Sequence, residues 1–294
     1  MNNDLTCPLC KIGEIEHVSD KLRYESSRKV YRCVSCGLYF LYPRMSADEE
    51  RIFYEKEYGE IFSHEKGTTP EKLFESRQPD AKLYFDWTRK FLDPSHSCLE
   101  LGCASGYFLA AIRGHVKDVS GIESHVLLKE HCKKIGIRTF DSPEKCDDNQ
   151  FDRIFMFFLL EHIGEPVNYL KSVKRILKKE GKLFIVVPNV DDALLALYDI
   201  PGFRSFYFTP AHQFYYSRST LSKVLTNAGL DTFTIYPKQR YDLSNHMHWM
   251  MYGKPGGTGK YNHIFSKTLL DEYAKNLMDC FRCDTLFAVV TKTI

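Results

Sequence analysis

Apolar and polar positions along the middle of the chain follow a pattern typical of strands that alternate with helices. Short apolar segments bounded by turn residues predict strands over 97–101, 119–123, 137–140, 153–160 and 182–187. Helical spacing between these segments predicts helices over 107–113, 126–135 and 166–178. Two more apolar segments, 232–236 and 285–291, bring the predicted strands to seven. The alternation predicts βαβ units and a mostly parallel sheet.

Composition fits a folded protein of ordinary type. The chain has 294 residues, of which 44% are hydrophobic and 27% charged, so two domains are expected. Its net charge of +2 argues against a dedicated nucleic-acid binder, which usually carries a strong basic excess. The longest apolar run, Ile154 to Leu160, is far shorter than the roughly 20 residues that span a bilayer. With no signal-peptide pattern at the N-terminus, we expect a cytoplasmic protein without a membrane span.

Four of the ten cysteines have the spacing of a metal site. They form two C-x2-C pairs separated by 22 residues, and in a reduced compartment such pairs bind metal rather than forming disulfides. Four thiolates complete a tetrahedral Zn2+ site with no open position, so the predicted role is structural. Residues 1–44 are therefore predicted to form a zinc ribbon. The predicted ligands are Cys7, Cys10, Cys33 and Cys36.

A third C-x2-C pair, Cys280 and Cys283, has a different context. It lies where a helical pattern gives way to the apolar strand 285–291, and a single pair cannot close a zinc site. We interpret these two cysteines as structural.

The remaining segments complete the predicted domain organisation. Residues 45–92 are expected to form a helical linker and lid, because a capping box at Ser46–Glu49 begins one helix, through about Tyr58, and a second follows over 71–92. Residues 93–294 form the main domain, with an insertion at about 190–266 expected to carry acceptor-binding loops. Within it, the glycine-rich segment 237–266 predicts either a flexible lid, with Lys254 near a phosphate, or a plain surface loop.

The turn after the first strand of the main domain carries the candidate chemistry. Gly102 and Gly106 permit a sharp bend with close ligand approach at the carboxyl end of strand 97–101. Open α/β sheets bind ligands at that edge. Glu123 ends the next strand, 17 residues after Gly106, where an acid can accept both hydroxyls of a ribose.

The segment Glu100-Leu-Gly-Cys-Ala-Ser-Gly106 resembles motif I of the class I S-adenosylmethionine-dependent methyltransferases, with Ala104 in place of the middle glycine. The blocks 151–162, 177–183, 187–189 and 212–230 are similar to later motifs of that family, so the resemblance covers about residues 90–236. It implies an α/β, Rossmann-like, seven-stranded, mostly parallel sheet with helices on both faces, beside the small N-terminal zinc ribbon. The ribbon, Pro43-Arg44 and the helix with Tyr54 and Tyr58 resemble a subgroup that acts on nucleotide-linked sugars and surface polysaccharide precursors.

The resemblance also implies a role for each matching residue. Glu100 is expected to reach the amino group of S-adenosylmethionine, directly or through water, and Glu123 to bind the ribose. Other expected cofactor contacts are Gly102, Cys103, Ala104 and Gly106 around the methionine part, Ser124 beside the ribose acid, Asp141 or Ser142 at the adenine, and Phe158 and Leu159 at the methyl-transfer site. The cofactors predicted are S-adenosylmethionine and a structural zinc ion.

Two histidines are candidate bases for a hydroxyl acceptor, because the pKa of imidazole lies near neutrality. His162 follows the fourth strand, and His212 lies in the long segment after the fifth. Each also has a purely structural interpretation. The sequence thus predicts methyl transfer to a small polar acceptor, a nucleotide-linked sugar or polysaccharide precursor. Two alternatives remain: an RNA-modifying methyltransferase that binds RNA with the ribbon, and a non-catalytic zinc-dependent scaffold.

Overall fold

The computed structural model describes residues 5–45, 49 and 68–293. Within these residues one sheet has seven strands and a second sheet has four. The helix predicted to begin at the Ser46–Glu49 capping box, including Tyr54 and Tyr58, lies outside the described residues except for Glu49.

The seven-stranded sheet has the order β10-β11-β8-β7-β4-β5-β6. Strands β4 to β8 run parallel, whereas β11 is antiparallel to both of its neighbours, β8 and β10. The predicted α/β fold with a mostly parallel seven-stranded sheet is confirmed. The strands are β4 (Ser97–Leu101), β5 (Asp118–Ile122), β6 (Arg138–Phe140), β7 (Phe151–Phe157), β8 (Leu177–Pro188), β10 (Phe233–Lys238) and β11 (Thr285–Thr291).

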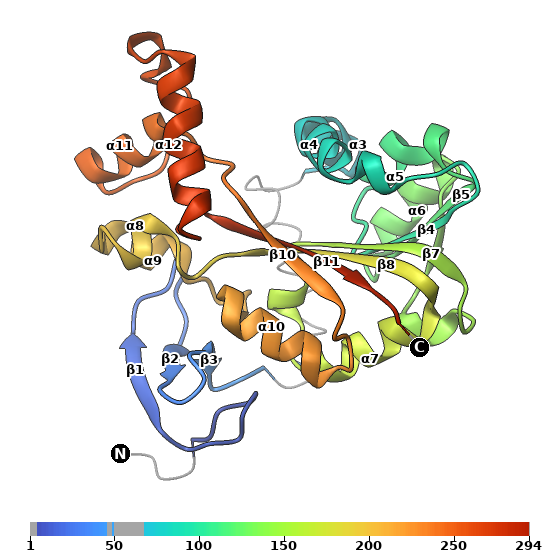
Figure 1. Cartoon of the computed structure of the whole chain (residues 1–294), viewed down its shortest axis with the longest axis horizontal. Helices are drawn as coiled ribbons and strands as arrows, with labels where there is room; N and C mark the ends of the chain where they lie inside the picture. Colours follow the sequence, from blue (N-terminus) through green and yellow to red (C-terminus); the bar gives the residue numbers. More distant parts are fainter. Residues whose placement is uncertain (1–4, 46–48, 50–67, 294) are drawn as a thin grey trace.

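Helices cover both faces of this sheet because its central strands are apolar on both sides (Figure 1). On one face Leu99 and Ile154 join a core with α7 (Pro166–Ile176) and α10 (Arg218–Asn227). On the other, Cys98 and Phe155 join a core with α4 (Gln78–Thr88) and α5 (Tyr107–Ile112), and with α6 (Val126–Lys134). Rings stack across this second face from Phe155 to Phe184, at 5.0 Å between centroids.

The segment expected as a linker contributes to the main core in its described part. Helix α3 (Pro70–Ser76) lies against α6, and α4 lies against α5. Tyr84 of α4 stacks on Phe157, with 4.4 Å between ring centroids. The described helices of this segment therefore form one wall of the large domain.

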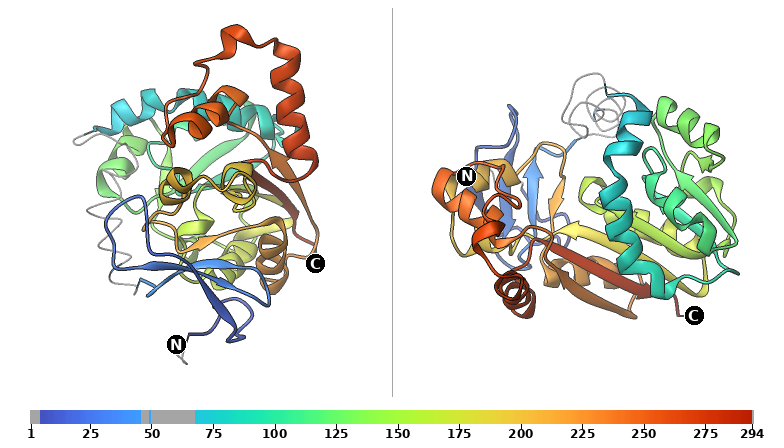
Figure 2. Two further views of the ribbon diagram at one scale, coloured as in Figure 1. Left: turned by 90° about the vertical axis from the view of Figure 1, so that its left-hand side faces the viewer. Right: turned by 90° about the horizontal axis from the view of Figure 1, so that it is seen from above.

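The N-terminal segment forms the smaller antiparallel sheet, in the order β1-β2-β3-β9. Its strands are β1 (Ile15–Ser19), β2 (Lys29–Cys33), β3 (Tyr39–Tyr42) and β9 (Phe214–Tyr215). The first three belong to the predicted ribbon, but β9 comes from the main domain, and Phe40 pairs with Phe214. A single sheet thus joins the ribbon to the insertion that follows β8 (Figure 2).

The insertion packs a third apolar core against the ribbon. Helices α8 (Ala193–Ala196), α9 (Pro201–Tyr207) and α11 (Leu243–Tyr252) supply it with Leu194, Phe203 and Trp249 respectively, and Val30 and Leu41 come from the ribbon. The last helix, α12 (Lys267–Asp279), stands beside α11 at the rim of the molecule (Figure 1). No helix in the described ranges is long and apolar enough to cross a membrane.

The expectation of a loop throughout 237–266 was wrong for residues 243–252, which form α11. Asp242 begins this helix by accepting a hydrogen bond from the Asn245 amide, and Gly253 ends it in a left-handed conformation. The glycines within residues 253–259 gave the whole segment an irregular pattern in the sequence, so this helix was not predicted.

Candidate functional site

A large cavity of about 1110 Å³ lies at the carboxyl edge of the parallel strands. Its walls come from the loops after β4, β5, β6 and β7 and from α4, α7 and the segment after β10. Eight residues predicted to contact the cofactor line it: Gly102, Ala104, Glu123, Ser124, Asp141, Ser142, Phe158 and Leu159. The structure therefore brings together most of the positions that the sequence predicted.

The turn after β4 is tight because its backbone is held against β5. The amides of Gly102 and Cys103 both donate to the Ile122 carbonyl, at 2.8 and 3.0 Å. Gly102 has φ 68°, and a Cβ there would lie 3.2 Å from Cδ1 of Leu159. Ala104 has φ 48°, a left-handed conformation that costs an L-residue about 1–2 kcal/mol. The departure from glycine at position 104 is therefore accommodated with backbone strain.

Glu123 connects this turn to the start of α6. Its Oε2 accepts a hydrogen bond from the Ala104 amide at 2.9 Å, and its Oε1 accepts one from the His125 amide at 2.8 Å. Burial raises the pKa of Glu123, although the two amides oppose the shift. The carboxylate lines the cavity and is held in one orientation, with lone pairs left for a further ligand.

Three predicted cofactor residues lie behind the cavity wall instead of on it. Glu100, Cys103 and Gly106 are absent from the lining, and all three are buried. Oε2 of Glu100 has no hydrogen-bond partner in the described structure, and burial raises the pKa of this carboxyl well above its ordinary value. An unpaired buried carboxyl next to the turn is a costly feature that a cationic ligand group would relieve.

The far end of the large cavity is polar. Asp141 and Ser142 follow β6 there, and Asp141 forms an ion pair with Lys129 at 2.8 Å. This ion pair lowers the pKa of the exposed Asp141 carboxyl. Asp141 and Ser142 can therefore offer an acceptor and a hydroxyl to a ligand at this end.

A second cavity, of about 280 Å³, adjoins the first. The two cavities share four wall residues: Arg77, Phe158, Arg240 and Tyr241. Phe158, at φ 51°, stands at their junction, and its amide donates to the Val186 carbonyl at 2.8 Å. A ligand in the large cavity and one in the small cavity would thus meet near the ring of Phe158.

Both candidate bases, His162 and His212, line the small cavity together with Glu161. The two imidazole rings meet edge to face, with 4.7 Å between centroids. Burial lowers the pKa of His162 to about 4 and that of His212 well below its ordinary value. Both rings are therefore neutral at pH 7.

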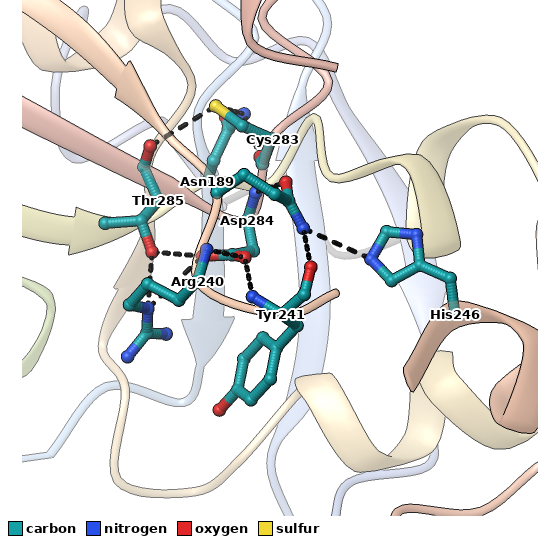
Figure 3. Close-up of polar contacts among 8 residues, drawn as sticks. Asn189, Arg240, Tyr241, His246, Cys283, Asp284 and Thr285 are labelled. Atoms are coloured by element: carbon teal, nitrogen blue, oxygen red, sulfur yellow. Dashed lines mark hydrogen bonds and ion pairs between the residues drawn. The ribbon is translucent and has the colours of Figure 1, made fainter. Parts of the chain in front are cut away.

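Arg240 is fixed at the junction by Asp284, a side chain that is only 4% exposed. The Asp284 carboxylate accepts hydrogen bonds from the Arg240 and Tyr241 amides, at 2.7 and 3.0 Å, and lies 3.2 Å from Nε of Arg240 (Figure 3). Although burial alone would lower it, Asp284 raises the pKa of Arg240. The guanidinium carbon lies 4.4 Å from the centre of the Phe158 ring. A permanent positive charge is thus held between the two cavities.

The ribbon also contributes to the small cavity. Arg23 and Tyr24, from the loop between β1 and β2, form part of its wall. The Arg23 amide donates to the Phe208 carbonyl at 2.7 Å, and its guanidinium lies 4.0 Å above the Phe206 ring. The ribbon is therefore part of the candidate site.

The four ribbon cysteines lie together, as the spacing predicted. Sγ of Cys7 is 3.5 Å from Sγ of Cys36, and Sγ of Cys10 is 3.5 Å from Sγ of Cys33. A tetrahedral Zn2+ site with bonds of about 2.3 Å places its sulfurs about 3.8 Å apart, so this cluster fits the ion. Backbone amides of Leu9 and Cys36 point at two of the sulfurs, which favours thiolates.

Neither cysteine of the third pair belongs to this cluster. Cys280 ends α12 and is exposed, whereas Cys283 is buried and forms a hydrogen bond with the Thr285 carbonyl. Both thiols donate to backbone carbonyls, and the structural interpretation of the pair stays a prediction.

Sequence reasoning missed Arg240, Asp284 and Arg23 and treated Glu161 only as a neighbour of His162. A signal existed for the first two. Strand β10 runs in the direction of β4 to β8, so the residue after it reaches the same edge, and the residue before antiparallel β11 reaches it too. No sequence pattern indicates that Arg23 lies at the cavity.

Comparisons with known proteins agree with the fold. A family model described as "Methyltransferase domain" matches residues 74–235, more than half of the chain. An uncharacterized protein of Methanocaldococcus jannaschii is 36% identical over 103 residues, which are 33% of this chain and 42% of that protein. The chain thus matches less than half the length of this curated relative.

Two solved structures are similar in fold. One is a SAM-dependent methyltransferase from Archaeoglobus fulgidus, with a TM-score of 0.50, 16% identity, and coverage of 72% of this chain and 94% of that one. The other is a complex of the Haloferax volcanii Trm112 methyltransferase activator with a putative methyltransferase. It has a TM-score of 0.50, 15% identity, and coverage of 75% and 98%.

Proposed function

We propose that this chain, which belongs to the methyltransferase domain family, transfers a methyl group from S-adenosylmethionine to a small polar molecule, a nucleotide-linked sugar or surface polysaccharide precursor. The observation that carries this proposal is the pair of cavities that meet at Phe158. The large cavity has the size and the carboxylates for a nucleoside cofactor. The small cavity, of about 280 Å³, has room for a small polar acceptor.

The residues of the large cavity fit the cofactor. Glu123 offers its remaining lone pairs to the ribose hydroxyls, and the unpaired carboxyl of Glu100 suits the cofactor's ammonium group. Asp141 and Ser142 are proposed to contact the adenine, and Gly102, Ala104 and Leu159 to surround the methionine part. Ser124 is proposed to border the ribose, and Cys103 and Gly106 to shape the turn from behind. When bound, the cofactor supplies an electrophilic methyl group.

Positioning is the main contribution of the chain to such a transfer, because the acceptor atom must lie in line with the methyl carbon. Phe158 occupies the junction through which the two ligands would meet, and its left-handed backbone is held by Val186. His162 and His212, which line the small cavity, are proposed to contact the acceptor there.

The charge of the small cavity supports a phosphorylated acceptor. In the described structure the terminal nitrogens of Arg240 have no hydrogen-bond partner, since Asp284 binds only its amide and Nε. A planar guanidinium with free donors is well suited to a phosphate. Arg23 places a second positive charge on the same wall.

We also propose that Cys7, Cys10, Cys33 and Cys36 hold a structural zinc ion. Such an ion would stabilise a ribbon of three short strands, which has little core of its own. Because Arg23 and Tyr24 belong to this ribbon, the ion would also help to shape the acceptor site.

The test is a two-step assay on the purified chain. Calorimetry first measures binding of S-adenosylmethionine and of its demethylated product. A panel of nucleotide sugars, the same sugars without the nucleotide, and total RNA is then offered with methyl-labelled cofactor. Label on a nucleotide sugar supports the proposal. Label on RNA alone would favour the RNA-modifying alternative, and cofactor binding without any transfer would contradict the proposed acceptor class.

A further inference from the structure

Three metal-binding side chains converge on the wall of the small cavity. Glu161 and His162 lie in the short 3-10 helix η4 (Leu160–His162) directly after β7, and His212 lies in the loop before β9. One ligand atom from each residue lies within 4.8 Å of those of the other two. These residues, called here the Glu161 cluster, are separate from the four ribbon cysteines, which form another group.

Glu161 is the unusual member of this cluster. Its side chain is only 1% exposed, and neither carboxylate oxygen has a hydrogen-bond partner in the described part of the chain. An unpaired buried carboxylate is costly, and buried charges in proteins are normally paired or bound to metal. The structure thus contains a buried carboxyl whose two oxygens have no hydrogen-bond partner among the described residues.

The surroundings of the two histidines are compatible with metal ligation. Nδ1 of His162 forms a hydrogen bond with the Ala211 carbonyl at 3.0 Å, a contact of the kind that fixes the ring of a metal-bound histidine. Nδ1 of His212 is buried and has no partner in the described structure.

We propose that Glu161, His162 and His212 bind a divalent transition-metal cation at the acceptor end of the site. Two imidazoles and one carboxylate suit Zn2+, Co2+, Ni2+, Fe2+ or Mn2+. Three protein ligands leave coordination positions open toward the cavity, as in catalytic metal sites and unlike the cluster of four ribbon cysteines. Arg240 also carries a positive charge in this cavity. The Asp284 carboxylate forms an ion pair with Arg240 and so offsets its repulsion of a bound cation.

The open positions face the cavity in which we place the acceptor. If the proposed function holds, an acceptor oxygen would occupy one of them, and the two histidines would act through the metal. This part of the inference rests on the proposed function, whereas cation binding by the Glu161 cluster does not.

Cobalt binding to the zinc-loaded full chain tests the site. The thiolate cluster keeps its zinc, so added Co2+ reports on other sites, and cobalt bound to nitrogen and oxygen lacks the thiolate charge-transfer absorption of a cysteine site. We expect about one additional equivalent of Co2+ per chain without that absorption. Glu161→Gln and His212→Ala should each weaken binding at least about tenfold, since each removes a direct ligand.

The matched control is Asp192→Asn, because Asp192 is a buried carboxyl in the same cavity but outside the cluster. This variant should bind Co2+ as the parent does. Glu161→Gln replaces a buried carboxyl without hydrogen-bond partners by an amide of the same shape, so the variant should remain folded. Cobalt should raise the melting temperature of the parent and not that of the variant.

Absence of the extra equivalent, or equal binding by the parent, Glu161→Gln and His212→Ala, would overturn the proposal. Equal loss in Asp192→Asn would also overturn it, because the cation would then follow the general field of the cavity. None of these measurements involves methyl transfer, so failure of the metal site and failure of the proposed acceptor are separate results.

Discussion

The Asp284 carboxylate holds Arg240 by two contacts, a 2.7 Å hydrogen bond from the backbone amide and a 3.2 Å ion pair with Nε. This pair joins the second residue after β10 to the residue before β11 at the edge of the sheet. It therefore sets the position of the positive charge that both cavities share.

Replacing Asp284 by Ala should lower the free energy of unfolding by about 3–5 kcal/mol, because it leaves the half-buried Arg240 guanidinium without its ion-pair partner and two backbone amides without their acceptor. Denaturant unfolding measures the loss. Asp231→Ala removes an exposed acid just before β10 and should change stability by less than about 0.5 kcal/mol. Equal stability of the two variants would show that the buried pair contributes nothing.

Glu123→Gln should weaken binding of S-adenosylmethionine by about 10–100-fold, the equivalent of about 1.5–3 kcal/mol for hydrogen bonds to a charged group. The amide keeps one oxygen for the Ala104 or His125 amide, so the turn should remain folded. Calorimetry measures the affinity, with Glu130→Gln on the exposed face of α6 as the control. Unchanged affinity in Glu123→Gln would remove this residue from the cofactor site.

The stability of the cofactor-free protein should depend on pH through Glu100. Its pKa is raised in the folded state, so the folded protein keeps a proton that the unfolded chain releases. The stability that the protonated Glu100 carboxyl contributes is therefore fully present below the unfolded pKa of about 4.3. As pH rises toward the folded pKa, the free energy of unfolding falls.

Glu100→Gln should remove this loss. Relative to the parent, the variant should gain about 1.4 kcal/mol between pH 5 and pH 8 for each unit by which the pKa is raised within that range. Thermal unfolding at the two pH values measures the difference. The same variant should bind the cofactor more weakly. A constant difference between parent and variant at both pH values would contradict the buried, uncompensated state of this carboxyl.

Gly121→Ala should displace the turn after β4, which we place at the cofactor site. A Cβ at Gly121 would lie 2.2 Å from Sγ and 2.9 Å from Cβ of Cys103, so the turn would have to move. We expect a loss of about 1–3 kcal/mol in unfolding free energy and weaker cofactor binding. At Gly114 a Cβ meets nothing within 4 Å, so Gly114→Ala is the matched control. Parent-like binding by Gly121→Ala would show that the turn tolerates displacement.

Cys33→Ser should lose about one zinc per chain in elemental analysis, because three thiolates and a hydroxyl replace the tetrahedral thiolate site. Amide exchange should rise in β2 and β3 and also in β9, since Phe40 pairs with Phe214. Cys280→Ser, an exposed cysteine outside the cluster, should keep the zinc and the slow exchange. A metal-free parent with the same protection of β9 would contradict the proposed zinc site.

The sequence predicted those features that depend on local pattern. Strand 97–101 and strand 285–291 have the expected bounds, since each is an apolar segment between turn residues. The cysteine cluster and the residues of the large cavity follow from spacing and from strand ends that meet at one edge.

Features that depend on distant contacts could not be predicted in this way. The pairing of Phe40 with Phe214 joins residues 174 positions apart, and nothing in either segment indicates the other. Arg240 is held in place by Asp284 and Thr285, which lie more than 40 residues further along the chain. The burial of Glu161 likewise depends on the insertion that folds over it.

The shared strand pairing between β3 and β9 has a consequence for how this chain could diversify. The ribbon ends in a strand that pairs with β9 of the main domain, so an unrelated segment could not replace it without loss of that pairing. A replacement would have to supply a strand that pairs with β9 and a residue that takes the place of Arg23 at the small cavity. The ribbon and the proposed acceptor preference would therefore have to evolve together.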